Sequence, residues 1–257
     1  MTIAGTRKFV DLSLSIEESE SEVIPVQLRY FTHREGAEQM GQIFGVNADT
    51  LPGKLGWAGE EVRMITHAGT HMDAPWHYGP VSQERPARTI DEVPLEWCYG
   101  PGVVLDFRNM QEGTEIVIDD LKSALARIDY QLHERDIVLL HTGADQWWGD
   151  KSYPERGVGL GHDATLWLLD QGIRVIGTDS WGLDRPFSYM RNEFQKTGNV
   201  NCIWPSHYAG RSKEYCQIEK LTHLELLPAR GFTVMCFPIK VTKASAGWTR
   251  VVAMFPD

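Results

Sequence analysis

The residues with the clearest chemical potential lie in one short segment, residues 67–77, which reads H-A-G-T-H-M-D-A-P-W-H. The segment holds three histidines and one aspartate. Imidazole nitrogens and carboxylate oxygens are common ligands for zinc and manganese in proteins. Their concentration here predicts a metal site, whereas any one of these histidines taken alone is more typical of a polar surface loop.

The backbone of this segment has to bend if its side chains are to meet. A fully extended chain would separate His67 from His77 by about 33 Å, too far for one cation to bind both. A regular helix is interrupted by Gly69 and ended by Pro75. We therefore expect the end of a strand followed by a tight glycine turn.

Such a turn would let His67, His71 and Asp73 surround one cation. Pro75 would stiffen the backbone and direct His77 toward the same cavity. No C-x-x-C pair accompanies the histidines, which argues against a zinc finger. The sequence also lacks the H-E-x-x-H pattern of helical zinc proteases.

The elements that must position these residues are predicted from hydrophobic runs and helix-start signals. Strands and helices alternate in the middle of the chain and strands cluster at its end, which favours a mixed α/β single domain spanning 1–257. Residues 27–60 lack sustained periodicity, so we interpret them as an insertion or lid-like loop, and the acidic stretch 17–22 as a solvated loop. Strands are predicted at 9–14, 61–66, 102–107, 136–142, 174–178, 232–241 and 249–255, and helices at 119–128, 163–171 and 187–196.

Composition excludes several classes of protein. Lys and Arg number 25 against 35 Asp and Glu, a net charge of −10, which argues against nucleic acid or an anionic membrane surface as the partner. No hydrophobic run is long enough to cross a membrane, and the N-terminal residues do not resemble a signal peptide. The four cysteines form no disulfide framework. We expect a cytoplasmic protein with a small-molecule substrate.

Residues 67–77 resemble the H-x-G-T-H-x-D-x-P-x-H motif of the cyclase family, which includes bacterial kynurenine formamidases and isatin hydrolases, and they match it at every fixed position. The resemblance extends over most of the chain. It implies a swivelling β/β/α fold and assembly as a homodimer or homotetramer. The matching segments are 11–13, 142–143, 161–169, 176–179 and the arginine at 250.

The resemblance also implies the roles of the site residues. His67, His71 and Asp73 would bind one divalent metal ion. Asp73 would bridge to a second ion held by His207 and Glu219, whose spacing of twelve residues matches the family pattern. One or two ions, Mn²⁺ or Zn²⁺, are therefore expected.

His77, the last histidine of the motif, would be the catalytic acid and base. A bound divalent cation activates water and polarises a carbonyl group, and a histidine suits proton transfer near neutral pH. A second possibility is that His77 is a further ligand or orients one. The implied reaction is metal-dependent hydrolysis of a cyclic amide, formamide or imide by an activated water molecule.

Aromatic residues near the motif segments would form the walls of a pocket for a planar, aromatic substrate. The final loop, residues 245–250, lacks the acidic residue usual in the family, which bears on the substrate. Three alternatives remain: a lactone hydrolase with the same site, a non-catalytic binder of metal or small molecules, and an interaction protein with a structural metal. The candidate substrate-binding residues are Trp76, Trp57, Phe31, Trp204 and Tyr208.

Overall fold

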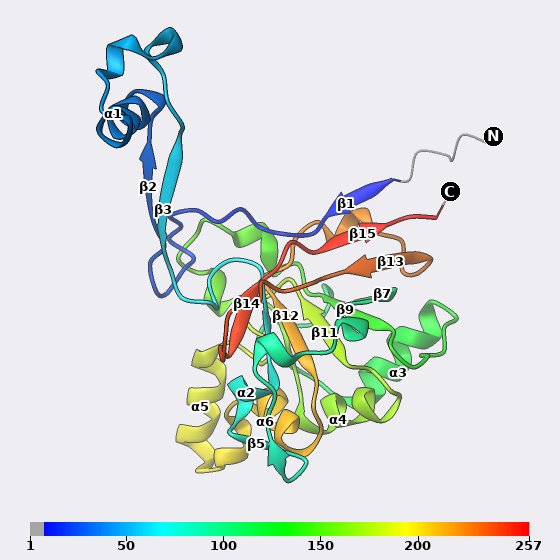
Figure 1. Cartoon of the computed structure of the whole chain (residues 1–257). Coiled ribbons are helices and arrows are strands. Elements are labelled where there is room, and N and C mark those ends of the chain that lie inside the picture. Colours follow the sequence, from blue (N-terminus) through cyan, green and yellow to red (C-terminus); the bar gives the residue numbers. More distant parts are fainter. Residues whose placement is uncertain (1–7, 257) are drawn as a thin grey trace, which may run out of the picture.

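The computed structural model describes residues 8–256 and is built around a mixed nine-stranded sheet (Figure 1). The strands β7, β9, β11 and β12 are parallel to one another, and the remaining pairs are antiparallel. In sheet order the strands are β1 (Phe9–Asp11), β15 (Val252–Met254), β13 (Phe232–Met235), β7 (Tyr99–Asp106), β9 (Ile137–His141), β11 (Val175–Thr178), β12 (Cys216–Glu219), β4 (His71–Asp73) and β14 (Ala246–Trp248).

Both faces of the central strands are buried, as expected for parallel strands covered on two sides. On β9, Ile137 and Leu139 belong to one hydrophobic cluster and Val138 and Leu140 to the other. This alternation follows from the two-residue period of a strand. A continuous run of large apolar residues therefore identifies β9 as the middle of the sheet.

Helices cover one of these clusters and surround the end of the sheet that carries β4, β12 and β14 (Figure 1). The helices α3 (Ile118–Arg127) and α4 (His162–Asp170) contribute Leu121 and Leu168 to the second cluster. The other α-helices of the body are α2 (Pro75–Tyr78), α5 (Phe187–Thr197) and α6 (Pro205–Ser212). Two small two-stranded sheets pair β8 (Glu115–Ile116) with β10 (Gly159–Leu160) and β5 (Val81–Ser82) with β6 (Arg85–Pro86).

A separate hairpin projects from the body, and we call residues 27–63 the arm (Figure 1). It consists of β2 (Gln27–Phe31), paired antiparallel with β3 (Gly59–Arg63), and of α1 (His33–Phe44) between them. The helix α1 begins with a capping box between Thr32 and Glu35 and ends at Gly45, whose φ of 67° favours glycine. The expected loop is thus an ordered hairpin that carries a helix; its function as a lid stays a prediction.

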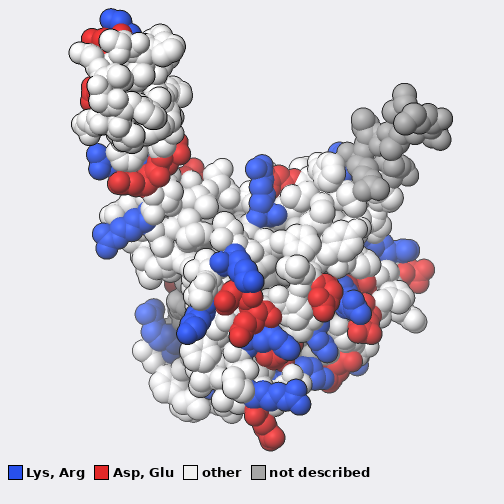
Figure 2. Space-filling model, viewed as in Figure 1, with Lys and Arg blue, Asp and Glu red and all other residues white. Residues whose placement is uncertain are grey.

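The arm buries few large side chains. In α1 the buried residues are Gly36, Ala37 and Gly41, and Figure 2 shows an arm surface made mostly of uncharged residues. No residue of the arm belongs to either hydrophobic cluster of the described chain. The arm is therefore held mainly by its own hairpin hydrogen bonds and helix caps. Its exposed large apolar residues include Tyr30, Ile43, Phe44, Leu55, Trp57 and Val62.

The predicted mixed α/β fold is confirmed, with two local differences. The strand predicted at 61–66 overlaps β3 and lies in the arm instead of the main sheet. The strand predicted at 232–241 ends at Met235, close to Pro238, which has no amide hydrogen for a sheet. Among the described residues, no helix is long and apolar enough to cross a membrane.

The arm can be shortened without disturbing the body. Leu28 and Val62 lie directly opposite each other, so an Asn-Gly turn joining them should close the hairpin. We expect the midpoint of thermal unfolding to change by less than about 4 °C, the shift that roughly 1 kcal/mol produces in a protein of this size. Circular dichroism would measure it. A much larger fall would show that the arm packs against something, such as a second subunit, and would contradict this expectation.

Candidate metal centre

Two neighbouring strands present four polar side chains on the same face of the sheet. Asp73 on β4 lies opposite Gln217 on β12, and His71 lies opposite Glu219. Because side chains alternate along a strand, these four project to one side. The residues between them point to the hydrophobic core.

The segment before β4 makes the expected glycine turn. Gly69 has a φ of +59°, a conformation that glycine adopts without strain. His71 Nδ1 donates a hydrogen bond to the Gly69 carbonyl at 2.9 Å, so its Nε2 is left as the electron-pair donor toward the site. Pro75 begins the short helix α2 instead of only stiffening an extended chain. That helical turn brings His77 back over β4.

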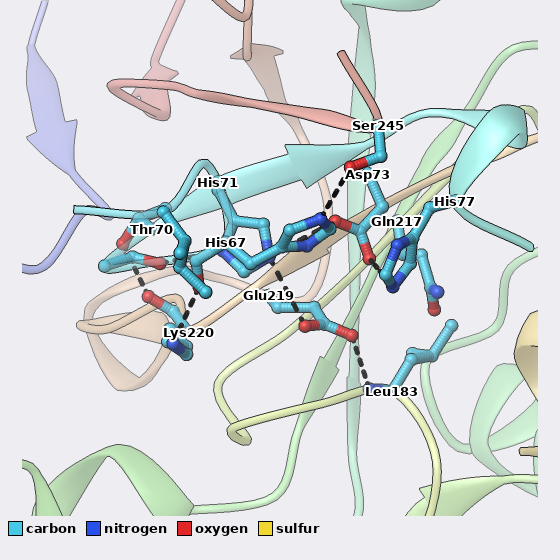
Figure 3. A network of polar contacts seen from close by, with 12 residues as sticks. His67, Thr70, His71, Asp73, His77, Leu183, Gln217, Glu219, Lys220 and Ser245 are labelled. Atoms are coloured by element: carbon cyan, nitrogen blue, oxygen red, sulfur yellow. Dashed lines mark hydrogen bonds and ion pairs between the residues drawn. The ribbon is translucent and has the colours of Figure 1, made fainter. Parts of the chain in front are cut away.

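The Asp73 carboxylate is the meeting point of the histidines of the motif (Figure 3). Its Oδ1 lies 2.8 Å from His67 Nδ1 and 3.2 Å from His71 Nε2. Its Oδ2 lies 3.8 Å from His77 Nε2. The carboxylate is fully buried, so these contacts are shielded from water.

The helix α6 and the strand β12 complete this cluster. His207 Nε2 lies 3.8 Å from Asp73 Oδ2 and 3.7 Å from Glu219 Oε1. Glu219 Oε2 lies 3.5 Å from His71 Nε2. The structure thus brings together all five predicted metal ligands and His77.

Unsatisfied polar atoms show that this cluster fits a cation. His71 Nε2 and both carboxylate oxygens of Asp73 are buried, and the imidazole and carboxylate groups that contact them do not make well-aligned hydrogen bonds to them. Burying a carboxylate without compensation is strongly unfavourable. Two sets of donor atoms lie within 4.8 Å of one another, His67–Asp73–His77 and His71–Asp73–Glu219. Asp73 belongs to both sets, as a bridging ligand would.

Burial and mutual charge determine the ionisation of the cluster. Burial lowers the pKa of His77 to about 4, so its imidazole is neutral near pH 7. Burial, reinforced by Asp73, raises the pKa of Glu219. Burial also favours the neutral form of Asp73, but the surrounding imidazoles lower the pKa of that carboxyl well below its usual range. A neutral imidazole beside a carboxylate can accept a proton.

His207 is oriented by the carboxylate of Asp184, to which no motif in the sequence assigns a role. Asp184 contacts His207 Nδ1 and accepts a hydrogen bond from Ser206 N at 2.7 Å. Burial alone would lower the pKa of His207, but Asp184 raises it. Carboxylates in this position fix the tautomer and direction of a metal-binding histidine. No spacing rule connects Asp184 to His207, since they are joined only by the fold.

A buried ion pair braces the glycine turn. Lys220 Nζ lies 2.7 Å from Glu22 Oε2, and the two side chains are 1% and 4% exposed. Lys220 also donates to the carbonyl of His67, and Glu22 accepts from Gly69 N at 2.6 Å. The prediction that 17–22 is a solvated loop is therefore wrong for Glu22, because its carboxylate is needed as the partner of a buried ammonium group.

A cavity of about 220 Å³ opens beside the cluster. Trp204 forms one wall: its ring stacks on His207 with centroids 4.2 Å apart. The backbone of Trp204 has a φ of +58° and precedes Pro205, a conformation disfavoured on both counts. Such strain is concentrated at functional sites. The remaining walls include Ile65, Pro154, Arg156, Trp181, Pro186 and Phe187.

The predicted aromatic walls were only partly brought to this cavity. Trp204 lines it, whereas Trp57 and Phe31 lie on the arm. Trp76 is 43% exposed and does not line this cavity, and Tyr208 lines a different one. Proximity along the chain to a motif does not determine which way a ring points. Trp181, on the connection between β11 and α5, and Phe187, the first residue of α5, do line the cavity, but neither belongs to a motif in the sequence.

The fold and the cluster define a mixed α/β protein with a candidate histidine–carboxylate metal centre. The chain belongs to the cyclase family, because the family described as "Putative cyclase" matches residues 10–185, more than half of its length.

Comparisons with individual proteins agree with this family. A kynurenine formamidase of Salinibacter ruber is 24% identical over 74% of this chain and 77% of its own length. That of Geobacillus thermodenitrificans is 30% identical over 48% of this chain and 52% of its own. The structure of isatin hydrolase A from Labrenzia aggregata superimposes with a TM-score of 0.76 and 22% identity, covering 98% of this chain and 95% of that one. At this identity the structural likeness shows the fold.

The buried ion pair should matter for stability. Replacing Lys220→Met leaves the Glu22 carboxylate buried without its partner, which should lower the free energy of unfolding by about 3–5 kcal/mol. The double variant with Glu22→Met should lose less than the sum of the two single changes. Urea denaturation would measure both. Lys151→Met, which removes an exposed ion pair with Glu20, is the control and should change little; an equally small effect at Lys220 would contradict the bracing role.

Proposed function

We propose that this protein is a metal-dependent hydrolase that cleaves the carbon–nitrogen bond of a formamide, cyclic amide or imide carried by an aromatic ring. The observation that supports it most is the convergence of six metal-binding or proton-transferring side chains at one end of an aromatic cavity. The kynurenine formamidases and isatin hydrolases among its relatives support a hydrolase.

The donor set favours one or two divalent ions, zinc or manganese. His67, His71, Asp73, His207 and Glu219 would hold them, with the Asp73 carboxylate shared. A divalent cation in such a site lowers the pKa of a water molecule and polarises a carbonyl oxygen. The orphaned Asp73 and His71 atoms are the part of the chain that most requires this charge.

His77 would move the protons. Its imidazole is held neutral by burial, and it lines the cavity from the side of the metal ligands. A neutral Nε2 can accept a proton from water and then donate it to the leaving nitrogen. The Trp204 and His77 rings meet at an angle of 69°, with their centroids 5.2 Å apart, so an apolar ring lies against the imidazole.

The cavity size fits a substrate with one aromatic ring. Its volume of about 220 Å³ exceeds that of a cavity of about 150 Å³ that admits benzene. The additional space accommodates an acyl group near the metal ligands. Trp204 and Trp181 provide apolar walls for the ring.

Hydrolysis assays would test this function. Metal-loaded protein should hydrolyse at least one of isatin, N-formylkynurenine and a cyclic imide, and chelator-treated protein should not. An unsaturated lactone in the same panel tests the lactonase alternative. Turnover of the lactone alone would replace the amide assignment, and tight metal binding with no turnover of any compound would count against catalysis.

The role of His77 has its own test. His77→Gln should lower kcat by about 10²- to 10⁴-fold, the range for loss of a general acid–base group, while metal affinity measured by calorimetry changes little. His133→Gln, on an exposed histidine, is the control. A large loss of metal affinity in His77→Gln would instead identify His77 as a ligand, which its place in the His67–Asp73–His77 set permits.

The number of metal ions bound per chain tests whether the Asp73 carboxylate is shared by two ions. Calorimetry or elemental analysis should find two metal ions per chain in the native protein. Glu219→Gln should bind one ion, and Asp73→Asn should bind no ion tightly. The reason is that Asp73 belongs to both donor sets and Glu219 to one. A single ion in the native protein, unaffected by Glu219→Gln, would overturn the two-ion arrangement and leave the hydrolase proposal standing.

A further inference from the structure

The cavity beside the candidate metal ligands is lined by a positively charged arginine as well as by those ligands. His67, His77, His207 and Glu219 line the end that faces the candidate metal centre. Arg156 also lines the cavity, and its side chain is 28% exposed. The lining of the cavity therefore combines candidate metal ligands, a partly exposed guanidinium group and apolar rings.

The Arg156 guanidinium is fixed in place by its neighbours. Its central carbon lies 3.7 Å from the centroid of the Trp147 ring, a close cation–π contact. Its Nε donates to Ser152 Oγ at 3.3 Å, and Nη1 donates to Glu112 at 3.2 Å. Its Nη2 has no hydrogen-bond partner among residues 8–256. An arginine fixed in this way loses little conformational freedom when it binds a ligand.

Apart from Glu219 of the candidate metal centre, the other charged residues of the wall each have a partner within the fold, although the buried Nε of Arg185 has no hydrogen-bond partner of its own. Their partners are buried or partly buried, and each pair is in direct contact. The pairs are Lys220 with Glu22, Asp184 with His207, and Arg185 with Glu193.

The partner of Arg156 is more exposed to water than any of these partners. The Glu112 side chain is 44% exposed, and an ion pair at such a position contributes little net free energy. A carboxylate that enters the cavity can therefore share or replace Glu112 on the guanidinium. Trp147 and Ser152 would keep Arg156 in the same place during that exchange.

We propose that Arg156 is a specificity-determining residue that binds an anionic group of the substrate, on the side of the ring away from the reacting carbonyl. This inference rests on the proposed hydrolase function and narrows its substrate to an aromatic formamide or cyclic amide with a carboxylate or sulfonate substituent. A guanidinium group recognises such anions with paired, charge-assisted hydrogen bonds. The metal ligands would receive the carbonyl end, and the aromatic walls the ring.

Matched neutral and anionic substrates test this inference. Formanilide is compared with its three carboxylated ring isomers, and isatin with isatin-5-sulfonate. The native enzyme should prefer at least one anionic compound by kcat/KM. Arg156→Gln should reduce that value about 10- to 100-fold, as expected for loss of a charge-assisted hydrogen bond, mainly through KM, and should leave the neutral compounds nearly unchanged.

Three further variants sharpen the result. Arg156→Lys keeps the charge and should restore part of the preference. Glu112→Gln removes the competing carboxylate and should strengthen it. Arg191→Gln removes an exposed charge on α5 outside the cavity and is the control for net charge. No preference in the native enzyme, or an equal loss for neutral and anionic compounds in Arg156→Gln, would overturn the inference.

A binding measurement separates this inference from the hydrolase proposal. The three aminobenzoate isomers are the amine products of the anionic formanilides. Calorimetry of metal-free protein with these isomers should show binding that Arg156→Gln weakens about tenfold or more. Absence of turnover together with Arg156-dependent binding would defeat the hydrolase proposal and retain the anion site. Turnover with binding that does not depend on Arg156 would defeat the anion site alone.

Discussion

The buried carboxylate of Asp73 is the constraint on which the rest of the site depends. It is buried and has no well-aligned hydrogen bond among the described residues, so its charge requires compensation from its surroundings. Burial alone would raise the pKa of Asp73, but the neighbouring imidazoles of His77, His71 and His67 lower it. The negative charge that these imidazoles leave uncompensated is what a bound cation would neutralise. The glycine turn, the register of β4 against β12 and the position of α6 all serve this requirement.

The surrounding supports join segments that are far apart in the sequence. Glu22 and Lys220 are separated by 198 residues, yet their ion pair holds the turn between His67 and Gly69. Asp184 fixes His207 from a different loop. Because each of these charges is buried, removing one partner leaves the other unpaired in a medium of low polarity. These buried contacts brace the base of the candidate metal centre from two distant segments of the chain.

The sequence alone predicted the parts of this architecture that depend on local chemistry. The long apolar run of β9 and the glycine turn at Gly69 follow from neighbouring residues, and both were predicted. The strands β4 and β12 were not, because they are short and carry the polar site residues instead of an alternating apolar pattern. Nor could the sequence assign a role to Asp184 or Trp181, since their positions depend on contacts across the fold. The roles assigned to the ligands and the expected oligomer stay predictions.

The candidate metal ligands and the outer walls of the cavity lie on different kinds of structural element. Three of the candidate ligands, His71, Asp73 and Glu219, lie on β4 and β12, which also contribute Met72 and Ile218 to the core, so changing them would disturb packing as well as chemistry. Trp181, Phe187 and Arg156 lie on or beside connecting loops, where substitutions leave the sheet intact. Selectivity can therefore change at the outer end of the cavity while the Asp73 cluster is kept. For this reason the shared motif predicts the chemistry of the site better than it predicts the compound that enters it.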